Sequence, residues 1–417
     1  MVDGVVEERP PAPAGHRYPG LRPAWAEIDL AAVRHNARLL RRLAAPAALC
    51  AVVKADAYGH GAVPVARAAL DGGATWLGVA LVEEGVTLRE AGIEAPVLVL
   101  SEPTADAMGE VVARGLTPTV YTAEGVAAAA RAAAAARSSL AVHVKVDTGM
   151  HRVGADATDL VALVRSVEAS PVLHFAALWS HLAVADEVGD EDRAFTAEQL
   201  RRLASARAAL AAAGCDPPMV HLANSAGAIA HPGARLDMVR CGIALYGVVP
   251  MPALDPVLAD DPAAREAGGL RPVLTLRSAV SFVRSLDAGE RPSYGRRRPL
   301  ERRSLVATVP VGYADGIPRR SSTAGATVLI GGRRRPLAGT VTMDQIVVDC
   351  GSDPLVSVGD EVVLIGRQGP GSLTVWDWAT VLGTIGNEVL TEIGSRVPRV
   401  VVDSGRTDGE SDEEERS

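Results

Sequence analysis

The sequence predicts an α/β protein in which a (β/α)8 barrel of the TIM type is followed by a mainly antiparallel β domain. Eight short apolar runs alternate with helix-like segments between residues 48 and 242. After residue 250 the pattern changes to β-rich runs separated by turns. The length of 417 residues is too great for one ordinary core, which favours two domains.

The eight apolar runs predict the barrel strands, because each is short and most are followed by a helix-like segment. Segments such as "GAVPVARAALDGG" and "TAEQLRRLASARAALAAAG" are amphipathic and end in glycine, as helices commonly do. A doubly wound open sheet has a similar alternation of strands and helices and is the alternative fold. The runs are residues 48–54, 75–80, 96–100, 116–120, 141–147, 173–181, 219–224 and 237–242.

The later runs, among them "VLTLRSAVSFVRSL", "RSLVATVPVG" and "EVVLIG", have few helical patterns and predict a separate antiparallel domain. We expect the first strand segment, "AWAEID", to belong partly to that domain. The predicted organisation is a disordered N-terminal extension over 1–23, a barrel over 24–258, a β domain over 259–402 and an acidic disordered tail over 403–417.

Composition excludes several classes of protein. Hydrophobic residues make up 48% and charged residues 22%, which is typical of a soluble globular chain. The net charge is −8, with six acids in "SGRTDGESDEEERS", so no nucleic-acid partner is expected. Neither a secretory signal nor an apolar run of membrane-spanning length occurs, so the sequence predicts a cytoplasmic protein without a membrane partner. Glycine-rich nucleotide-binding fingerprints are also lacking.

The four cysteines are scattered along the chain and form no C-x-x-C pair. They therefore predict reduced thiols, with neither disulfides nor a metal site. They are Cys50, Cys215, Cys241 and Cys350.

The chain contains only two lysines, Lys54 and Lys145, whereas the other forty cationic side chains are arginines. Either cation suits a solvated surface, but only lysine offers an amine that can lose its proton and attack a carbonyl. Lys54 closes the first apolar run, and Lys145 lies near the end of the fifth. Since chemistry in a barrel collects where the strands end, both lysines are expected at one mouth.

Other polar residues also follow the strands. His181 ends the sixth run, Asn224 and Ser225 follow the seventh, and Arg240 lies in the eighth. Gly242 and Ile243 come directly after that strand, where backbone N–H groups can hold a phosphate. A lysine amine near a phosphate site indicates a Schiff base, with pyridoxal phosphate or with substrate. An ordinary helix cap is the alternative for Ser225.

Long motifs of the chain resemble those of alanine racemases, in the family's order, from about residue 24 to 401. The resemblance implies pyridoxal 5'-phosphate chemistry of fold type III, on a barrel plus a β domain that works as a head-to-tail homodimer. The motifs are "AVVKADAYGHG", "VKVDTGMHRVG", "WSHLAVADE", "HLANSAGA", "DMVRCGIALYG", "PSYG", "VPVGYADG" and "GTVTMDQIVVD".

By this resemblance, Lys54 forms the Schiff base with pyridoxal phosphate and is one of two catalytic bases. Tyr294 is the second, contributed by the other subunit to the opposite face of the substrate. Racemisation removes a proton from one face and returns one to the other, so two opposed acid–base groups suffice. The ordinary alternative for Tyr294 is an aromatic residue packed on a sheet.

Arg240 resembles the family's partner of the pyridine nitrogen, and His181 the residue that orients this arginine. Because arginine only donates hydrogen bonds, it leaves that nitrogen neutral and the ring a weaker electron acceptor. Arg152 resembles the arginine near the substrate carboxylate. Lys145 matches a position that is a carbamate in many relatives, and that anion would anchor Arg152.

Further positions match cofactor and substrate contacts of the family. Tyr58, Asn224, Ser225, Gly242 and Ile243 match contacts to the phosphate and the rest of the cofactor. Met343, Asp344 and Tyr313 match partner-subunit residues that line the path of the substrate. In one departure, Asn387 in "GTIGNEVLT" replaces a common tyrosine.

The expected function is the interconversion of L-alanine and D-alanine, which supplies D-alanine for peptidoglycan. An alternative function is that of a racemase with broader or other amino-acid specificity on the same scaffold. A non-catalytic pyridoxal-phosphate carrier is a second alternative, but such barrels typically lack the second domain. A decarboxylase of this fold type normally has an acid at the position of Arg240.

Overall fold

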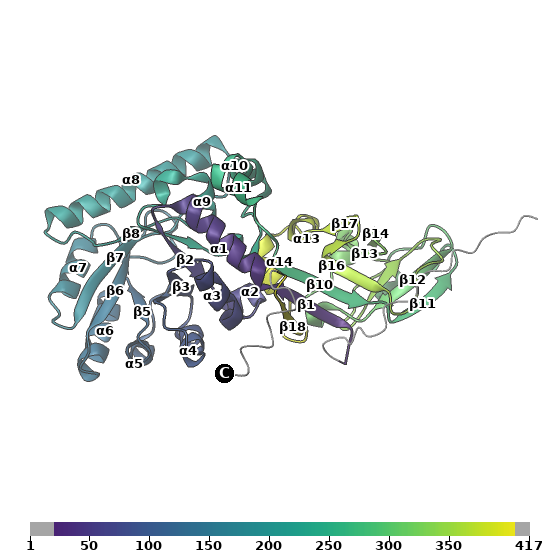
Figure 1. Ribbon diagram of the computed structural model, residues 1–417, viewed down its shortest axis with the longest axis horizontal. Coiled ribbons are helices and arrows are strands. Elements are labelled where there is room, and N and C mark those ends of the chain that lie inside the picture. The colour runs from purple at the N-terminus through teal and green to yellow at the C-terminus, as the bar shows by residue number, and fades with distance from the viewer. Residues whose placement is uncertain (1–20, 405–417) are drawn as a thin grey trace, which may run out of the picture. The chain divides into compact units, whose positions relative to one another are not determined.

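The structure is a computed structural model that describes residues 21–404 (Figure 1). The predicted N-terminal extension and acidic tail therefore lie outside the described residues, apart from 21–23 and 403–404. The described chain forms two compact units. The barrel unit comprises Glu27–Thr275, Ser372–Gly394 and residues 401–404, and the β unit comprises residues 21–26, Leu276–Gly371 and Ser395–Val400. The domain boundaries expected from the sequence stay a prediction.

Eight parallel strands close into a barrel in chain order, as the apolar runs predicted, and the open-sheet alternative is wrong. The first strand pairs with both the second and the eighth, which completes the ring. Because both faces of such strands are covered, they consist of nearly continuous apolar residues. The strands are β2 (Ala48–Val52), β3 (Trp76–Val79), β4 (Val97–Val99), β5 (Thr117–Val120), β6 (Leu140–Lys145), β7 (Leu173–Trp179), β8 (Val220–His221) and β9 (Met238–Cys241).

Helices connect and surround the barrel strands (Figure 1). They are α2 (Lys54–Gly59), α3 (Ala62–Asp71), α4 (Val82–Glu90), α5 (Met108–Ala113), α6 (Ala123–Ala135), α7 (Leu160–Glu168), α8 (Asp190–Ala212) and α9 (Ser225–Ala230). Four further helices of the same unit follow the last barrel strand, namely α10 (Asp255–Asp260), α11 (Pro262–Ala267), α13 (Val375–Leu382) and α14 (Gly386–Thr391). The 3-10 turns are η1 (Ala105–Ala107), η2 (Pro232–Ala234), η3 (Ile243–Tyr246) and η4 (Pro252–Leu254).

Helix α1 (Leu30–Ala44) precedes the barrel and is strongly amphipathic. The Asp29 carboxylate caps it by accepting the backbone N–H groups of Ala31 and Ala32. One face buries apolar side chains such as Leu39 and Leu43, whereas arginines occupy the opposite face.

The remaining strands form two sheets, and the prediction of an antiparallel domain is confirmed. A seven-stranded sheet has the order β14-β13-β16-β10-β1-β18 with β17 paired to β16, and a smaller sheet has the order β11-β12-β15. The pairs β10–β16, β13–β16, β11–β12 and β12–β15 are antiparallel. The elements are β1 (Ala24–Asp29), β10 (Leu274–Ala279), β11 (Phe282–Leu286), β12 (Ser304–Val309), β13 (Thr327–Ile330), β14 (Arg333–Pro336), β15 (Ile346–Asp349), β16 (Glu361–Gln368), β17 (Gly371–Leu373) and β18 (Arg399–Val402), with η5 (Tyr294–Arg296), η6 (Tyr313–Asp315) and α12 (Ser321–Ala324).

The four cysteines are free and buried, which confirms the prediction of reduced thiols. Burial raises the pKa of Cys50 and of Cys241 to about 12, so neither thiol is a nucleophile at neutral pH. Within residues 21–404, helices long and apolar enough to cross a bilayer are absent.

Candidate active site

Lys54 lies two residues beyond the end of β2, at the carboxyl-terminal mouth of the barrel, and is half-buried. Burial lowers its pKa, and the nearby positive charge of Arg152 lowers it further, against the opposing effect of Glu84. A lowered pKa makes the neutral amine more available than on an ordinary surface lysine. The amine is therefore suited to attack a carbonyl.

The four residues after Lys54 have a left-handed helical backbone, although none of them is glycine. Their φ angles lie between 50° and 55° over residues 55–58. Each such residue costs about 1–2 kcal/mol, so the turn persists only because other contacts hold it. Ala55 N–H donates to the Glu84 carboxylate at 2.6 Å, and Ala62 N–H donates to the Asp56 carboxylate at 2.7 Å.

Tyr58 ends this left-handed turn and reaches the backbone that follows β9. Its ring packs against Tyr246 at a centroid distance of 4.7 Å, and the Tyr246 hydroxyl donates to Val52 O at 2.8 Å. A Cβ atom on Gly242 would lie only 2.3 Å from the Tyr58 hydroxyl oxygen. Position 242 therefore has to be glycine for the tyrosine to take this place.

The hydroxyls of Tyr58 and Ser225 lie together with the backbone of residues 242–244, and we call this cluster the anion cup. The Ser225 hydroxyl accepts from Gly242 N–H at 3.0 Å and from Ala244 N–H at 3.4 Å. The helix-cap alternative for Ser225 is wrong, because Asn224 caps α9 by accepting Gly227 N–H at 2.9 Å. Hydroxyls and converging N–H groups are the donors that bind phosphate oxygens in proteins.

Arg240 in β9 is buried, with 3% of its surface exposed, and is surrounded by hydrogen-bond acceptors. Its Nη1 donates to Nδ1 of His221 at 2.8 Å. Its Nη2 lies 2.8 Å from Ser180 O, 2.9 Å from Leu222 O and 3.1 Å from Nδ1 of His181. Within the described chain its Nε–H has no acceptor, so this donor is free for a ligand.

These contacts determine the protonation of the surrounding imidazoles. Arginine cannot accept a hydrogen bond, so Nδ1 of His221 accepts and its proton lies on Nε2. That Nε2 donates to Nδ1 of His143 at 3.1 Å. Burial, followed by the charge of Arg240, lowers the pKa of His143 to about 3 and holds that of His221 well below its usual value. Both imidazoles are therefore neutral.

His181 experiences the same effects, since burial and then Arg240 hold its pKa well below the usual value. Burial lowers the pKa of Arg240 itself to about 10, so its guanidinium keeps its charge at neutral pH. Sequence reasoning found His181 but missed His143 and His221. The available signal for His221 was its place within the seventh apolar run.

Lys145 ends β6 within the same mouth and is almost fully buried. Its Nζ lies 4.4 Å from the centre of the Trp179 ring, and the Arg240 guanidinium lies 4.5 Å from the same ring. Burial, and then the charges of Arg240 and Arg152, lower the pKa of Lys145 to about 8.

Arg152 is exposed and follows a loop in which the Asp147 carboxylate accepts Gly149 N–H at 2.8 Å.

A second group of predicted residues lies in the β unit. Tyr294 is 71% exposed on η5, and its carbonyl accepts from the Thr340 hydroxyl at 2.8 Å. Tyr313 and Met343 are also exposed. Their segments are joined by backbone bonds, since Tyr313 N–H donates to Thr342 O at 2.9 Å and Ala314 N–H to Met343 O at 3.0 Å.

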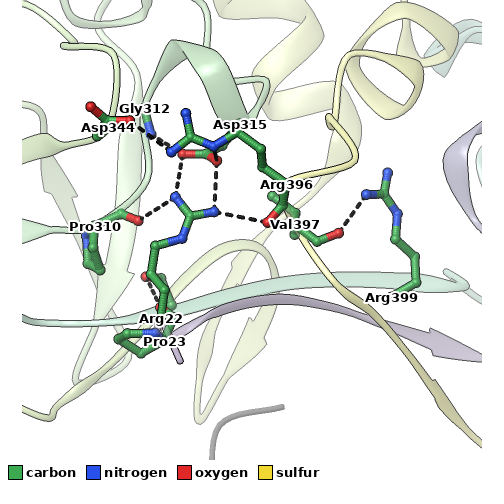
Figure 2. Close-up of polar contacts among 10 residues, drawn as sticks. Arg22, Pro23, Pro310, Gly312, Asp315, Asp344, Arg396, Val397 and Arg399 are labelled. Atoms are coloured by element: carbon green, nitrogen blue, oxygen red, sulfur yellow. Dashed lines mark hydrogen bonds and ion pairs between the residues drawn. The ribbon is translucent and has the colours of Figure 1, made fainter. Parts of the chain in front are cut away.

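A buried carboxylate fixes the turn that carries Tyr313 (Figure 2). Asp315 is 1% exposed and accepts two hydrogen bonds of 2.8 Å from Arg22, plus one of 2.9 Å from Gly312 N–H. Arg396 lies 3.4 Å from the same carboxylate and donates to Asp344 at 2.8 Å. The ion pairs thus connect the Tyr313 turn to the residue after Met343. Sequence reasoning missed Arg22, Asp315 and Arg396.

The structure brings the barrel residues of the predicted site to one mouth. These are Lys54, Tyr58, Lys145, Arg152, His181, Asn224, Ser225, Arg240, Gly242 and Ile243. The β-unit residues Tyr294, Tyr313, Met343 and Asp344 form their own cluster.

Fold and site together define a barrel enzyme whose mouth offers a lysine amine, an anion cup and a buried arginine donor. Residues 28–250 match the family model described as the alanine racemase N-terminal domain, and residues 273–401 match the alanine racemase C-terminal domain. The chain belongs to the alanine racemase family.

Individual relatives and solved structures agree with that assignment. The alanine racemase of Symbiobacterium thermophilum is 47% identical over 91% of this chain and 97% of its own length. The crystal structure of alanine racemase from Streptomyces lavendulae has a TM-score of 0.83 at 40% identity, covering 92% of this chain and 98% of its own. The Bacillus anthracis alanine racemase, solved with bound L-Ala-P, has a TM-score of 0.84 at 35% identity, covering 93% and 97%.

The left-handed turn makes a testable prediction. Ala55→Gly is expected to leave stability unchanged or to raise it by up to about 1.5 kcal/mol, because glycine relieves a strain of about 1–2 kcal/mol and loses about 0.5–1 kcal/mol in chain entropy. The matched control is Ala127→Gly, at an exposed position inside α6, which should lose about 1 kcal/mol. Thermal unfolding of both variants checks this, and equal losses would contradict the account of the turn.

Proposed function

We propose that this protein interconverts L-alanine and D-alanine with pyridoxal 5'-phosphate bound at Lys54. The observation that carries the proposal is the Lys54 amine, with its lowered pKa, at the same mouth as the anion cup and Arg240. Family membership gives the substrate class. D-alanine for peptidoglycan is the expected product in a cytoplasmic enzyme.

The residues of the barrel mouth fit this cofactor. Tyr58, Ser225, Gly242 and Ile243 would hold the phosphate, and the free Nε–H of Arg240 would donate to the pyridine nitrogen. When bound to the substrate amine, pyridoxal phosphate withdraws electrons from the Cα atom and makes its proton acidic. Arg240 limits this withdrawal because it is always a donor and leaves the ring nitrogen without a proton.

Two bases complete the reaction. The Lys54 amine takes or returns the proton on one face of the Cα atom, and Tyr294 of the partner subunit acts on the other. The high exposure of Tyr294 supports a role outside its own unit. Arg152 would bind the substrate carboxylate. Tyr313, Met343 and Asp344 of the partner subunit would line the substrate's path in a homodimer.

An assay of the purified protein with added cofactor tests this function. L-alanine should be converted to D-alanine, and Lys54→Ala and Tyr294→Phe should each be nearly inactive. L-serine and L-lysine in the same assay distinguish a racemase of other specificity. A protein that binds the cofactor but converts none of these amino acids would be a carrier.

Mixing the two inactive variants tests whether the bases come from different subunits. Each mixed dimer has one site with both defects and one site with an intact Lys54 and an intact Tyr294. Random pairing makes about half of the dimers mixed, so activity should recover to about a quarter of wild type. If both bases belonged to one chain, subunit exchange would restore nothing.

We further propose that Lys145 is a carbamate that anchors Arg152. Only the neutral amine attacks carbon dioxide, and a pKa of about 8 makes that form available about two and a half pH units earlier than for an ordinary lysine. Carbamate formation should therefore rise as the pH increases through about 8.

Carbon-13 NMR of the protein in labelled bicarbonate measures this directly. Wild type should give a carbamate signal that Lys145→Arg lacks. Lys145→Ala should lose most activity, and acetate should restore part of it by supplying a carboxylate beside Arg152. An active wild type without that signal, together with an unimpaired Lys145→Ala, would refute the proposal.

A further inference from the structure

A groove lined by arginines runs along α1 and the end of α3, and none of its lining residues belongs to the site at the barrel mouth. It consists of two adjoining hollows of about 600 Å³ and 440 Å³, which share Arg38 and Asp71. We call it the arginine groove and define it by five side chains. These are Arg34, Arg38, Arg41, Arg42 and Arg271.

The arginine groove carries an excess of positive charge, because its five arginines outnumber the two acids in its lining, Asp71 and Asp403. Arg34 forms an ion pair with Asp403. Arg42 lies 3.6 Å from Glu266, and the side chains of Arg42 and Glu266 are both exposed. Within residues 21–404, the guanidinium groups of Arg38, Arg41 and Arg271 have no carboxylate at ion-pair distance. Arginines spaced four and three residues apart on one helix face repel each other unless an anion lies between them. The groove therefore suits a ligand with several negative charges.

The chain itself brings such a segment to one end of the groove. Asp403 and its partner Arg34 are both largely shielded from solvent. The Ser404 hydroxyl donates at 2.6 Å to Asp29, the residue that caps α1. The polypeptide thus reaches the first turn of α1 before residue 405.

Residues 405–417 follow directly and lie outside the described part of the chain. They contain six acids against two arginines, and four of the acids are consecutive in "DEEE". Thirteen residues can span up to about 43 Å, whereas Arg34 and Arg42 are only about 12 Å apart along the helix. Length and charge are therefore both sufficient for this segment to follow the groove.

We propose that the acidic segment 405–417 binds in the arginine groove of its own chain, where its carboxylates neutralise Arg38, Arg41 and Arg271. Attachment at Asp403 makes the binding intramolecular, so weak individual ion pairs act together at a high effective concentration. The bound segment also excludes other polyanions from the groove.

Disulfide trapping in the full-length protein tests the position of the segment. The native cysteines are buried, so introduced cysteines react selectively. Ser411→Cys combined with Ala45→Cys, which lines the groove, should cross-link within one chain at least about tenfold faster than Ser411→Cys with Ala127→Cys on α6.

The charge dependence of the cross-link distinguishes docking from random contact. The faster cross-linking at Ala45 than at Ala127 should disappear in about 1 M salt. It should also disappear when Arg38→Gln, Arg41→Gln and Arg271→Gln are combined, three substitutions at exposed positions. Equal rates at both positions, insensitivity to salt and arginine removal, or cross-links only between chains would overturn the proposal.

A second measurement examines the alternative that the groove serves an external polyanion. Binding of a single-stranded DNA 20-mer is compared between wild type and a variant in which all six acids of residues 405–417 are amides. The proposal expects the neutralised variant to bind at least about tenfold more tightly at low salt. Equal, arginine-dependent binding by both proteins would assign the groove to an external ligand and contradict the proposal.

Discussion

The hydrogen bonds around Arg240 are the interaction on which the barrel mouth depends. A buried guanidinium is costly unless its donors are satisfied, and here two carbonyls and two imidazoles accept from it. All these partners come from the ends of β7 and β8 or the residues just after them. The closed barrel is therefore what allows the arginine to be buried, and burial together with the charge of the arginine keeps the adjacent imidazoles neutral.

The same arrangement explains how a mouth rich in cations remains reactive. Arg240, Arg152 and the two lysines lie near one another, and the resulting repulsion adds to burial in lowering the pKa of both amines. A lysine is useful as a nucleophile or base only when it can lose its proton. The arginines cannot do so, which leaves Lys54 and Lys145 as the titrating groups.

Much of the fold could be predicted from the sequence, because buried parallel strands consist of apolar runs that are easy to recognise. Lys54, Lys145 and Arg240 were found because each ends or lies in such a run. The left-handed turn could not be predicted, since "ADAY" contains no glycine and the conformation depends on Glu84, nearly thirty residues away. His143 and His221 were missed because they come from different strands and meet only when the barrel closes. The arginine groove could not be predicted either, because the net charge of −8 gives no sign of a local cluster of arginines.

The central claim is that the two imidazoles and two carbonyls in contact with Arg240 all accept hydrogen bonds from it. Nitrogen-15 NMR tests this most directly, because it shows which imidazole nitrogen carries a proton. The nine histidines can be assigned with single His→Gln variants. His143, His181 and His221 should each carry a proton on Nε2 and none on Nδ1, unchanged between about pH 6 and pH 9. A proton on Nδ1 of His221, or a cationic imidazole among the three in that range, would contradict the account.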